Sequence, residues 1–529
     1  MNLIQNYKID TFKMIFRQIG GLQIILGFTM LIPLIVSLIY YEFYSAIGFS
    51  ASFLLCNIIG ISFYKGFKTS SEPLHRHALI IAAMGWLTIA MMGALPFMII
   101  AYITPESVAQ QFVPAGANYN SSIFFFKNPL HAIFESMSGF TTTGLSMAVH
   151  EPSIGKGLLF YRSFTQLLGG AGFIVLTLAL LGQSSGKVAF LLYGAESTGE
   201  RLRPTIIETA RSIWKIYIGL TLFSFIYLFI GTYIILPGYS LTENIFDSLN
   251  HAMAGQSTGG FSTLDDSIAG YQSKAMDMLY LLPMILGALS LPFYFKVLHD
   301  KQFSQFWKNL QTRSIIITCV FGSIVLSVML LKSGVISEPF RIGIFQFISA
   351  LTTTGWQTSD VHLWDSASVV FIVMAAMIVG GAAGATVGGV KIIRVLLLFK
   401  GLFWHINSYF YSENSIKVVK FNNKRLLPDE MNKELASVAS FVFIYLIFIM
   451  IGTLITYYNM TPGFTIKDAL FESASAQGTV GLSSGITNPE MSPTLEITYI
   501  IQMWVGRLEI IPVLVLFRTI LLGTNPKVI

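Results

Sequence analysis

Four short segments of the chain share a pattern of threonine, serine and glycine that could bind a cation. They align without gaps and cover Phe134–Ser146, Asn250–Ser262, Phe345–Gln357 and Phe471–Ser483. In each, an apolar stretch leads into a four-residue motif that ends at a glycine. The motifs consist of Thr141, Thr142, Thr143 and Gly144; Ser257, Thr258, Gly259 and Gly260; Thr352, Thr353, Thr354 and Gly355; and Gly478, Thr479, Val480 and Gly481.

The chemistry that these motifs could do is coordination of a small cation by oxygen atoms. Rings of backbone carbonyls replace the hydration shell of K⁺ in channel filters, and hydroxyl groups add further oxygen ligands. Glycine permits positive φ and lets the backbone approach an ion closely. We therefore expect the motifs to meet on one pseudo-fourfold axis as a selectivity filter, with K⁺ bound by Thr142, Thr143, Thr258, Gly259, Thr353, Thr354, Thr479 and Val480.

The alternative is that these segments are ordinary external loops. A single Thr-Gly-rich turn would favour that interpretation. Four copies in one register, each after the same kind of short apolar segment, favour the filter. Apolar segments of about 10 to 14 residues are re-entrant rather than spanning, and non-helical backbone at membrane depth is tolerated only where protein or water lines it.

The elements that position these loops must lie in a membrane. The 529 residues are 53% hydrophobic and only 11% charged, whereas soluble domains carry about 25% charged residues. The formal net charge of +6 does not indicate nucleic-acid binding, because the basic residues occur in short stretches between apolar runs. Cys56 and Cys319 are expected to be packing residues, since two distant cysteines form no disulfide framework and no zinc site.

Ten apolar runs are long enough to span a bilayer, which needs about 20 mostly apolar residues. Basic residues precede the first run and follow each even-numbered run up to the eighth, so the positive-inside rule places both termini in the cytoplasm. The runs lie near residues 22–43, 46–64, 79–102, 157–183, 213–237, 275–298, 313–333, 366–390, 436–458 and 494–522.

Each Thr/Ser/Gly segment lies between two of these runs, so the repeating unit is span, short helix, loop, span. The sequence thus predicts an all-α membrane protein with four parallel repeats around a central pore and two additional N-terminal helices. The predicted division is 1–75 for the two N-terminal helices, then 76–212, 213–312, 313–434 and 435–529 for the four repeats.

A second shared feature follows each filter glycine by 25 residues. Gly169-Gly170, Gly380-Gly381 and Gly506-Arg507 occupy one register, and Ile285-Leu286 stands there in the second repeat. Small-residue packing between helices explains the first pair. It does not explain the third repeat, where Gly380, Gly381, Gly384, Gly388 and Gly389 fall within ten residues. Each glycine costs a helix about 1 kcal/mol, so we expect a break in the pore here.

Charged residues near the pore are few. Arg507 lies near the middle of a span and needs carbonyls, a carboxylate or water; carbonyls of residues 380–389 are the expected partners, and Glu509 is not. Arg162 and Lys467 are expected to extend toward the membrane surface without a special role. Glu135 and Glu472 occupy equivalent places and are expected to anchor the filter, with a cation-attracting field as the alternative.

These features point away from enzymes. The sequence contains no HExxH motif, no GxSxG motif in a suitable context and no cluster of histidines and carboxylates. A secondary transporter with alternating access, coupled to H⁺ or Na⁺, remains the alternative to a channel-like uptake protein. Such a transporter uses charged residues within its spans, and this chain has few.

The sequence resembles the Trk/Ktr/HKT superfamily of K⁺ transporters, and specifically the TrkH type, over essentially its whole length. The resemblance includes the four filter segments, residues 195–199, Arg203-Pro204, the stretch from Thr209 to Trp214, and residues 506–509. It implies uptake of K⁺ across the inner membrane of a bacterium. In plant relatives, serine in place of the first filter glycine goes with Na⁺ transport, so Gly144 implies K⁺.

The resemblance also implies how the pore is controlled. Residues 380–389 would form an intramembrane gate held by Arg507, although Ala385 and Val387 replace the serine and glycine that are typical there. The protein would be a homodimer surrounded by lipid and would bind no organic cofactor. A cytoplasmic ring of TrkA-type RCK subunits would dock on segments 184–212 and 401–434. ATP, ADP or NAD would bind to that partner, since this chain has no P-loop and no GxGxxG fingerprint.

Overall fold

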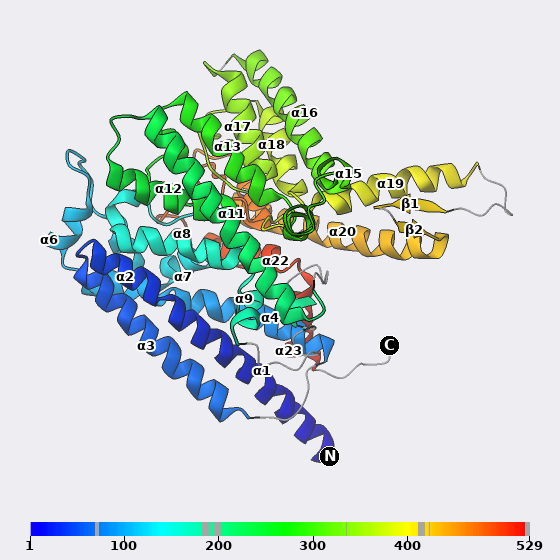
Figure 1. The fold of residues 1–529 in the computed structure, drawn as a ribbon, viewed down its shortest axis with the longest axis horizontal. Helices are drawn as coiled ribbons and strands as arrows, with labels where there is room; N and C mark the ends of the chain where they lie inside the picture. The colour runs from blue at the N-terminus through cyan, green and yellow to red at the C-terminus, as the bar shows by residue number, and fades with distance from the viewer. Residues whose placement is uncertain are drawn as a thin grey trace.

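The computed structural model describes residues 2–68, 74–181, 190, 192–194, 203–334, 336–364, 366–410, 418–422 and 424–523. The described chain is mostly helical (Figure 1). Its first helices precede the repeats, as predicted: α1 (Asn2–Thr29) and α2 (Leu31–Ile39) form one bent segment that packs against α3 (Phe43–Gly66).

The helix order then repeats four times, each time as a long segment, a short helix and a second segment. The first repeat contains α4 (His75–Gly93) with α5 (Leu95–Ile103), α7 (Pro129–Phe140), and α8 (Lys156–Gly170) with α9 (Phe173–Leu181). The second contains α11 (Ile206–Ile235), α12 (Leu241–Gln256), and α13 (Lys274–Ala288) with α14 (Leu291–Tyr294) and η5 (Phe295–His299). The third contains α16 (Leu310–Ser333), α17 (Pro339–Leu351), and α18 (Ala367–Val379) with α19 (Ile392–Ser408). The fourth contains α20 (Pro428–Asn459), α21 (Ile466–Gly478), and α22 (Pro493–Arg507) with α23 (Ile511–Leu522).

Small elements connect these segments. On one side of the molecule lie α6 (Glu106–Ala109), η1 (Gln110–Phe112), η2 (Ser122–Lys127), η3 (Glu151–Ile154) and η4 (Ser267–Tyr271). The connection between the second and third repeats contains α15 (Gln305–Lys308). An antiparallel hairpin of β1 (Val419–Phe421) and β2 (Lys424–Leu426) joins α19 to α20, with Lys420 opposite Arg425.

The short helices of the repeats, α7, α12, α17 and α21, are built to start sharply and to end at the filter motifs. Asn128 caps α7 by accepting the Leu130 N–H, and α7 and α17 begin with Pro129 and Pro339 at positions that need no N–H donor. A capping box between Thr465 and Asp468 starts α21. Because all four helices end where the motifs begin, the negative ends of their dipoles face the same region, which favours a cation there.

The predicted spans that follow the filter motifs are present, but each is a broken helix rather than a continuous one. Six helices or near-continuous helix pairs of the described chain are long and apolar enough to cross a membrane, and α13 with α14–η5 forms a seventh that bends by 92°. All four post-filter segments are interrupted: at 171–172, 289–290, 380–391 and 508–510. The sequence predicted only the third of these breaks, because it alone is rich in glycine.

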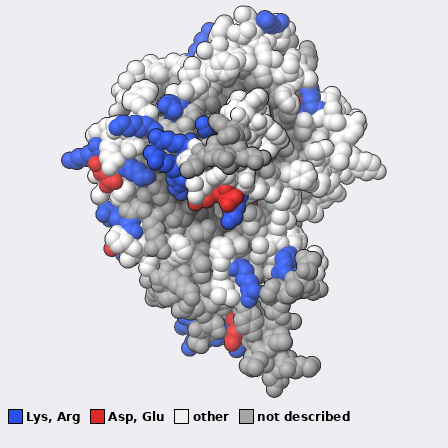
Figure 2. Space-filling model, turned by 90° about the vertical axis from the view of Figure 1, so that its right-hand side faces the viewer, with Lys and Arg blue, Asp and Glu red and all other residues white. Residues whose placement is uncertain are grey.

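The two ends of the molecule differ. In Figure 1, α19, α20 and the hairpin project to the right, and α6 lies on the opposite side. Figure 2 shows the face on the right-hand side of Figure 1, where lysine and arginine clearly predominate over aspartate and glutamate. The sequence bias in basic residues therefore corresponds to one face of the folded molecule.

Candidate ion pathway

The four filter motifs share one backbone conformation. Their second residues have left-handed φ values of 56° at Thr142, 52° at Thr258, 52° at Thr353 and 48° at Thr479. The final glycines have φ of 97°, 77°, 84° and 94° at Gly144, Gly260, Gly355 and Gly481. In each loop the N–H groups of the second and third residues donate to carbonyls of the preceding helix, at distances from 2.8 to 3.2 Å. Each short helix therefore fixes its own filter loop.

The glycines also show how the loops meet. A Cβ atom at Gly144 would lie 2.4 Å from the Gly259 carbonyl oxygen, and one at Gly260 would lie 1.9 Å from that of Thr354. A Cβ at Gly355 would lie 1.9 Å from the Val480 oxygen, and one at Gly481 would lie 2.1 Å from the Thr143 oxygen. Each repeat thus abuts the next and the fourth abuts the first, so the loops form a closed ring. The threonine and serine side chains of this ring are fully buried.

One carbonyl in this ring differs from its three equivalents. The Gly259 carbonyl accepts a hydrogen bond of 2.6 Å from Nε2 of Gln166 in α8. Gln166 Oε1 in turn accepts the Phe261 N–H at 3.2 Å. Gln166 was not predicted as a site residue, because its role depends on a contact between the first and second repeats that the sequence pattern does not show.

The residue nine positions before each filter glycine connects the short helix, by hydrogen bonds, to the segment that follows the filter motif. Glu135 accepts the Met147 N–H at 2.8 Å, and Glu472 accepts the Ser484 N–H at 2.8 Å. His251 Nε2 lies 3.1 Å from Ser262 Oγ, and Gln346 Nε2 donates to the Ser359 carbonyl at 3.0 Å. We call these four residues, Glu135, His251, Gln346 and Glu472, the filter staples. The anchoring role expected for the two glutamates agrees with this geometry, and the sequence analysis missed His251 and Gln346.

The expectation that Arg162 extends toward the membrane surface is wrong. Its side chain is 1% exposed, and its Nε donates to Glu135 at 2.6 Å. It also donates to the Ser262 carbonyl at 3.2 Å and to Ser146 Oγ at 2.9 Å. Arg162 stays inside because Glu135, Ser146 and the Ser262 carbonyl accept its hydrogen bonds there, and it links the first filter loop to the second. Lys467 Nζ donates to the Trp364 carbonyl at 2.7 Å.

Residues 380–391 separate α18 from α19 and run directly beneath the filter ring. Gly380, Gly384 and Gly389 have φ of 66°, 78° and 72°, which explains the need for glycine at these positions. The Gly388 N–H donates to Thr353 Oγ1 at 3.1 Å. A Cβ at Gly388 would lie 2.1 Å from both the Gly478 oxygen and Thr479 Oγ1, and Gly381 packs against Ala288. These glycines therefore let the loop lie against the filter backbone.

Thr386 is the residue of this loop that the sequence analysis overlooked. Its side chain is fully buried, and its Oγ1 lies 3.1 Å from Thr258 Oγ1 and donates to the Gly287 carbonyl at 3.1 Å. The hydroxyl thus joins the loop to the second filter motif. Nothing in the sequence around Thr386, which lies between two glycine-rich stretches, predicts this contact.

Arg507 holds the loop from the fourth repeat. Its guanidinium donates to the Thr386 carbonyl at 2.8 Å, to the Gly170 carbonyl at 2.9 Å and to the Gly169 carbonyl. It also donates to Thr142 Oγ1 at 3.2 Å. The partners include the loop carbonyls expected from the sequence. Arg507, Thr386 and Gly388 each bond to a filter threonine, so the loop and the filter motifs are in direct contact.

Sequence analysis did not expect Glu509 to be the partner of Arg507, and Glu509 pairs with other residues. It lies at the break between α22 and α23 and accepts from Lys391 Nζ at 2.6 Å and from Arg394. These two cations belong to the end of the loop and the start of α19. The ion-pair cluster therefore connects the breaks of the third and fourth repeats.

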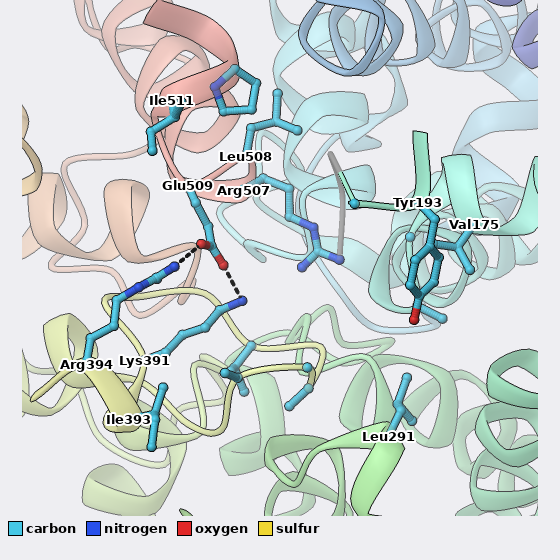
Figure 3. Close-up of a pocket in the computed structure, with 18 of the residues that line it drawn as sticks. Val175, Tyr193, Leu291, Lys391, Ile393, Arg394, Arg507, Leu508, Glu509 and Ile511 are labelled. Carbon is cyan, nitrogen blue, oxygen red and sulfur yellow. Dashed lines mark hydrogen bonds and ion pairs between the residues drawn. The ribbon is translucent and has the colours of Figure 1, made fainter. Parts of the chain in front are cut away.

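A cavity of about 420 Å³ opens beneath the loop and Arg507. Its lining comes from all four repeats and includes Val175, Tyr193, Leu291, Lys391 and Arg507. In Figure 3 the Arg507 side chain points into the middle of this cavity, while Glu509 faces Lys391 and Arg394 at its side. The cavity, Arg507 and the filter ring thus follow one another along the same path.

The remaining glycines of the shared register serve packing, as expected for Gly169. A Cβ at Gly169 would lie 1.8 Å from the Phe140 carbonyl oxygen, and one at Gly506 would lie 2.1 Å from that of Gln477. In the second repeat, Gly287 has the same role against Gln256. Ile285 and Leu286 themselves are only partly buried. Residues 195–199 of the predicted cytoplasmic segment lie outside the described residues.

In the described part of the chain, no group of three or more His, Cys, Asp or Glu side chains could hold a metal ion. The oxygen atoms available to a cation in the ring are therefore backbone carbonyls and threonine hydroxyls. Such ligands suit a large, weakly hydrated cation in transit rather than a tightly bound metal.

Comparison with known proteins identifies the architecture. The family model described as TrkH, cation transport protein, matches residues 49–523. The Trk system potassium uptake protein TrkH of Escherichia coli is 29% identical over 96% of this chain and 98% of its own. A protein of Methanocaldococcus jannaschii described as an uncharacterized cation transporter is 32% identical over 96% of this chain and 95% of its own.

A solved structure shares the fold over nearly the whole length. The crystal structure of the potassium transporter TrkH from Vibrio parahaemolyticus superposes with a TM-score of 0.76 at 25% sequence identity, and the match covers 96% of this chain and 98% of that one. The prediction of an all-α membrane protein is thereby confirmed. The relatives are transporters, which agrees with the expectation that the chain is no enzyme.

Proposed function

The chain belongs to the TrkH family of cation transport proteins, and we propose that it takes up K⁺ across the inner membrane of a bacterial cell. The observation that carries this proposal is the closed ring of four filter loops, in which every repeat places a glycine against a carbonyl of its neighbour. Potassium uptake by the E. coli relative supports K⁺ as the ion. The basic face of Figure 2 supports a cytoplasmic position for both termini.

In the proposed pathway, K⁺ loses its water in the ring and binds the oxygens of Thr142, Thr143, Thr258, Gly259, Thr353, Thr354, Thr479 and Val480. Residues 380–389 form the gate below it, with Arg507 as the residue that holds the gate closed. The hydrogen bonds from Arg507 and Gly388 to filter threonines support this role, because they hold the loop against the filter ring, on the path that the ion would take. The cavity beneath Arg507 would receive the ion.

The test is ion flux through the purified protein in liposomes, with K⁺, Rb⁺, Na⁺ and Li⁺ compared under an imposed membrane potential. We expect K⁺ and Rb⁺ to pass faster than Na⁺ and Li⁺, and protein-free liposomes to set the background. A pH-sensitive dye inside the liposomes reports any coupled H⁺ movement. Equal rates for all four ions, or no flux above background, would contradict the proposed function.

We further propose that a TrkA-type ring of RCK subunits docks on the basic face and that these subunits bind ATP, ADP or NAD. The exposed hairpin residues Lys420, Lys424 and Arg425 on that face support this surface. Charge reversal of these three residues should abolish co-purification with the subunit from the same genome and leave basal flux unchanged. Undiminished co-purification would show that the hairpin is not the contact.

The homodimer is proposed from the family resemblance alone. Native mass measurement of the protein in mild detergent is expected to give twice the mass of one chain. A monomer that retains full flux in liposomes at a low protein-to-lipid ratio would refute this assembly.

A further inference from the structure

The four filter staples differ in chemistry, and one of them is a buried carboxyl group for which the described residues supply no cationic partner. Glu472 is fully buried. Its two carboxylate oxygens accept hydrogen bonds from the N–H groups of Ser484 at 2.8 Å and Thr487 at 3.2 Å. Hydroxyl groups of Ser483 at 2.8 Å, Ser484 at 2.9 Å and Thr487 add further donors. Since an ionised carboxylate only accepts hydrogen bonds, this set of donors matches the charged form.

The equivalent carboxylate of the first repeat has a partner. Glu135 accepts from Arg162, which is the seventh residue of α8. The seventh residue of α22 is Tyr499, which is buried and whose hydroxyl lies 3.1 Å from Thr456 Oγ1. Both helices begin at the same distance in sequence from their filter glycines, so a neutral phenol replaces a guanidinium. Among the described residues, Glu472 forms no ion pair with any lysine, arginine or histidine.

The other two staples are neutral. His251 Nε2 accepts the Thr263 N–H at 3.4 Å, so that nitrogen carries no proton, and Gln346 is an amide. A second carboxyl, Glu151, lies 3.8 Å from Arg162. Burial raises the pKa of Glu151 to about 8, with Arg162 opposing that shift. The first repeat therefore places a guanidinium against its staple carboxylate, whereas the described residues of the fourth place none against Glu472.

We propose that Glu472 sets the affinity of the ring for cations: its negative charge, behind the fourth filter loop and without a cationic partner among the described residues, raises cation occupancy of the ring. A buried charge without a partner is strongly unfavourable, and interactions at short range are strong in a low-dielectric interior. The transported cation in the ring is the available counter-ion. The inference rests on the proposed function, since it requires that cations enter the ring.

The first test replaces the charge and keeps the shape. Glu472→Gln should raise the KM for K⁺ in liposome uptake by about threefold or more, with a smaller change in maximal rate. Thr487→Val is the matched control, because it removes one donor to Glu472 and leaves the carboxylate charged. It should leave KM near the wild-type value if charge is the cause.

A second variant tests the same charge without altering Glu472. Tyr499→Arg supplies the guanidinium that the first repeat has, and it should raise KM in the same direction, whereas Tyr499→Phe should not. If the thermal unfolding midpoint shows that Glu472→Gln does not fold, the KM values of Tyr499→Arg and Tyr499→Phe test the proposal instead.

The outcomes are distinct. A higher KM for Glu472→Gln or Tyr499→Arg with normal KM for Thr487→Val supports the proposal. A wild-type KM in a folded Glu472→Gln protein, or an equal rise in Thr487→Val, overturns it and leaves Glu472 as an anchor only. If the wild-type protein itself carries no K⁺, the proposed function fails before this comparison begins.

Discussion

Alanine in place of Arg507 is expected to raise K⁺ flux about tenfold or more in the absence of any partner subunit. Arg507 holds residues 380–389 by the hydrogen bond to the Thr386 carbonyl and bridges to the first repeat through Gly169 and Gly170. A hydrogen bond to a charged group contributes about 1.5–3 kcal/mol, and 1.4 kcal/mol shifts an equilibrium tenfold. Losing this residue should therefore favour the state in which the loop has moved aside.

The measurement is Rb⁺ uptake into liposomes, with and without the TrkA-type subunit. Arg507→Lys is the matched control, since it keeps the charge and loses the forked geometry; we expect an intermediate flux. Deletion within residues 381–388 should act in the same direction and weaken dependence on the partner. If folded Arg507→Ala protein carries no more Rb⁺ than wild type, the loop is not the barrier and its glycines serve packing.

The contacts between loop and filter bear on the K⁺ over Na⁺ selectivity that we expect of Arg507→Ala. The preference for K⁺ over Na⁺ should be largely kept in Arg507→Ala, because the ring glycines do not depend on Arg507. Thr142 loses one donor in this variant, so any loss of selectivity would trace to the first repeat. Double replacement of Arg507 and Thr386 would separate the two contacts.

Serine at Gly144 is expected to lower K⁺ over Na⁺ discrimination by about tenfold, whereas serine at Gly260 or Gly355 should abolish transport. The reason is crowding: a Cβ would fall 2.4 Å from the neighbouring carbonyl oxygen at Gly144 and 1.9 Å at the other two positions, so the backbone must shift in every case and must shift least at Gly144. All three glycines have positive φ, which adds strain for any other residue. The Gly259 carbonyl beside Gly144 also accepts a hydrogen bond from Gln166, which helps to fix the contact between the first and second repeats.

Competition of Na⁺ and Li⁺ with Rb⁺ uptake measures this discrimination. Thermal unfolding of each variant controls for misfolding, and Gly116→Ser serves as a mutational control because no atom lies within 4 Å of a Cβ there. Unchanged discrimination in folded Gly144→Ser protein, or normal transport by Gly355→Ser, would contradict the assignment of the ring as the filter.

The sequence predicted the parts of this molecule that repeat. The four motifs share length, register and glycine position, so their common backbone and the positive φ of the glycines could be anticipated. The left-handed φ at Thr142, Thr258, Thr353 and Thr479 could not, since β-branched residues rarely adopt it. It is imposed by the hydrogen bonds of each loop to the last turn of its own helix, a local C-terminal cap in which glycine or asparagine is the usual left-handed residue.

Contacts between repeats also escaped prediction. Arg162 is an arginine near the end of an apolar run, which usually indicates a side chain directed to the membrane surface. Its burial depends on Glu135, a residue of a different helix. The break at 508–510 contains Glu509 and Ile510 with φ of 55° and 69° and no glycine, so composition gave no sign of it. Such features arise only when four similar but unequal units meet.

The closed ring of loops has a genetic consequence. A filter assembled from four identical subunits changes at four places with every mutation, so its variants are drastic. Here one codon alters one quarter of the circumference, because each glycine contacts the carbonyl of a different repeat. Under the proposed function, a mutation would therefore change the ring at one seam and leave the other three as they were.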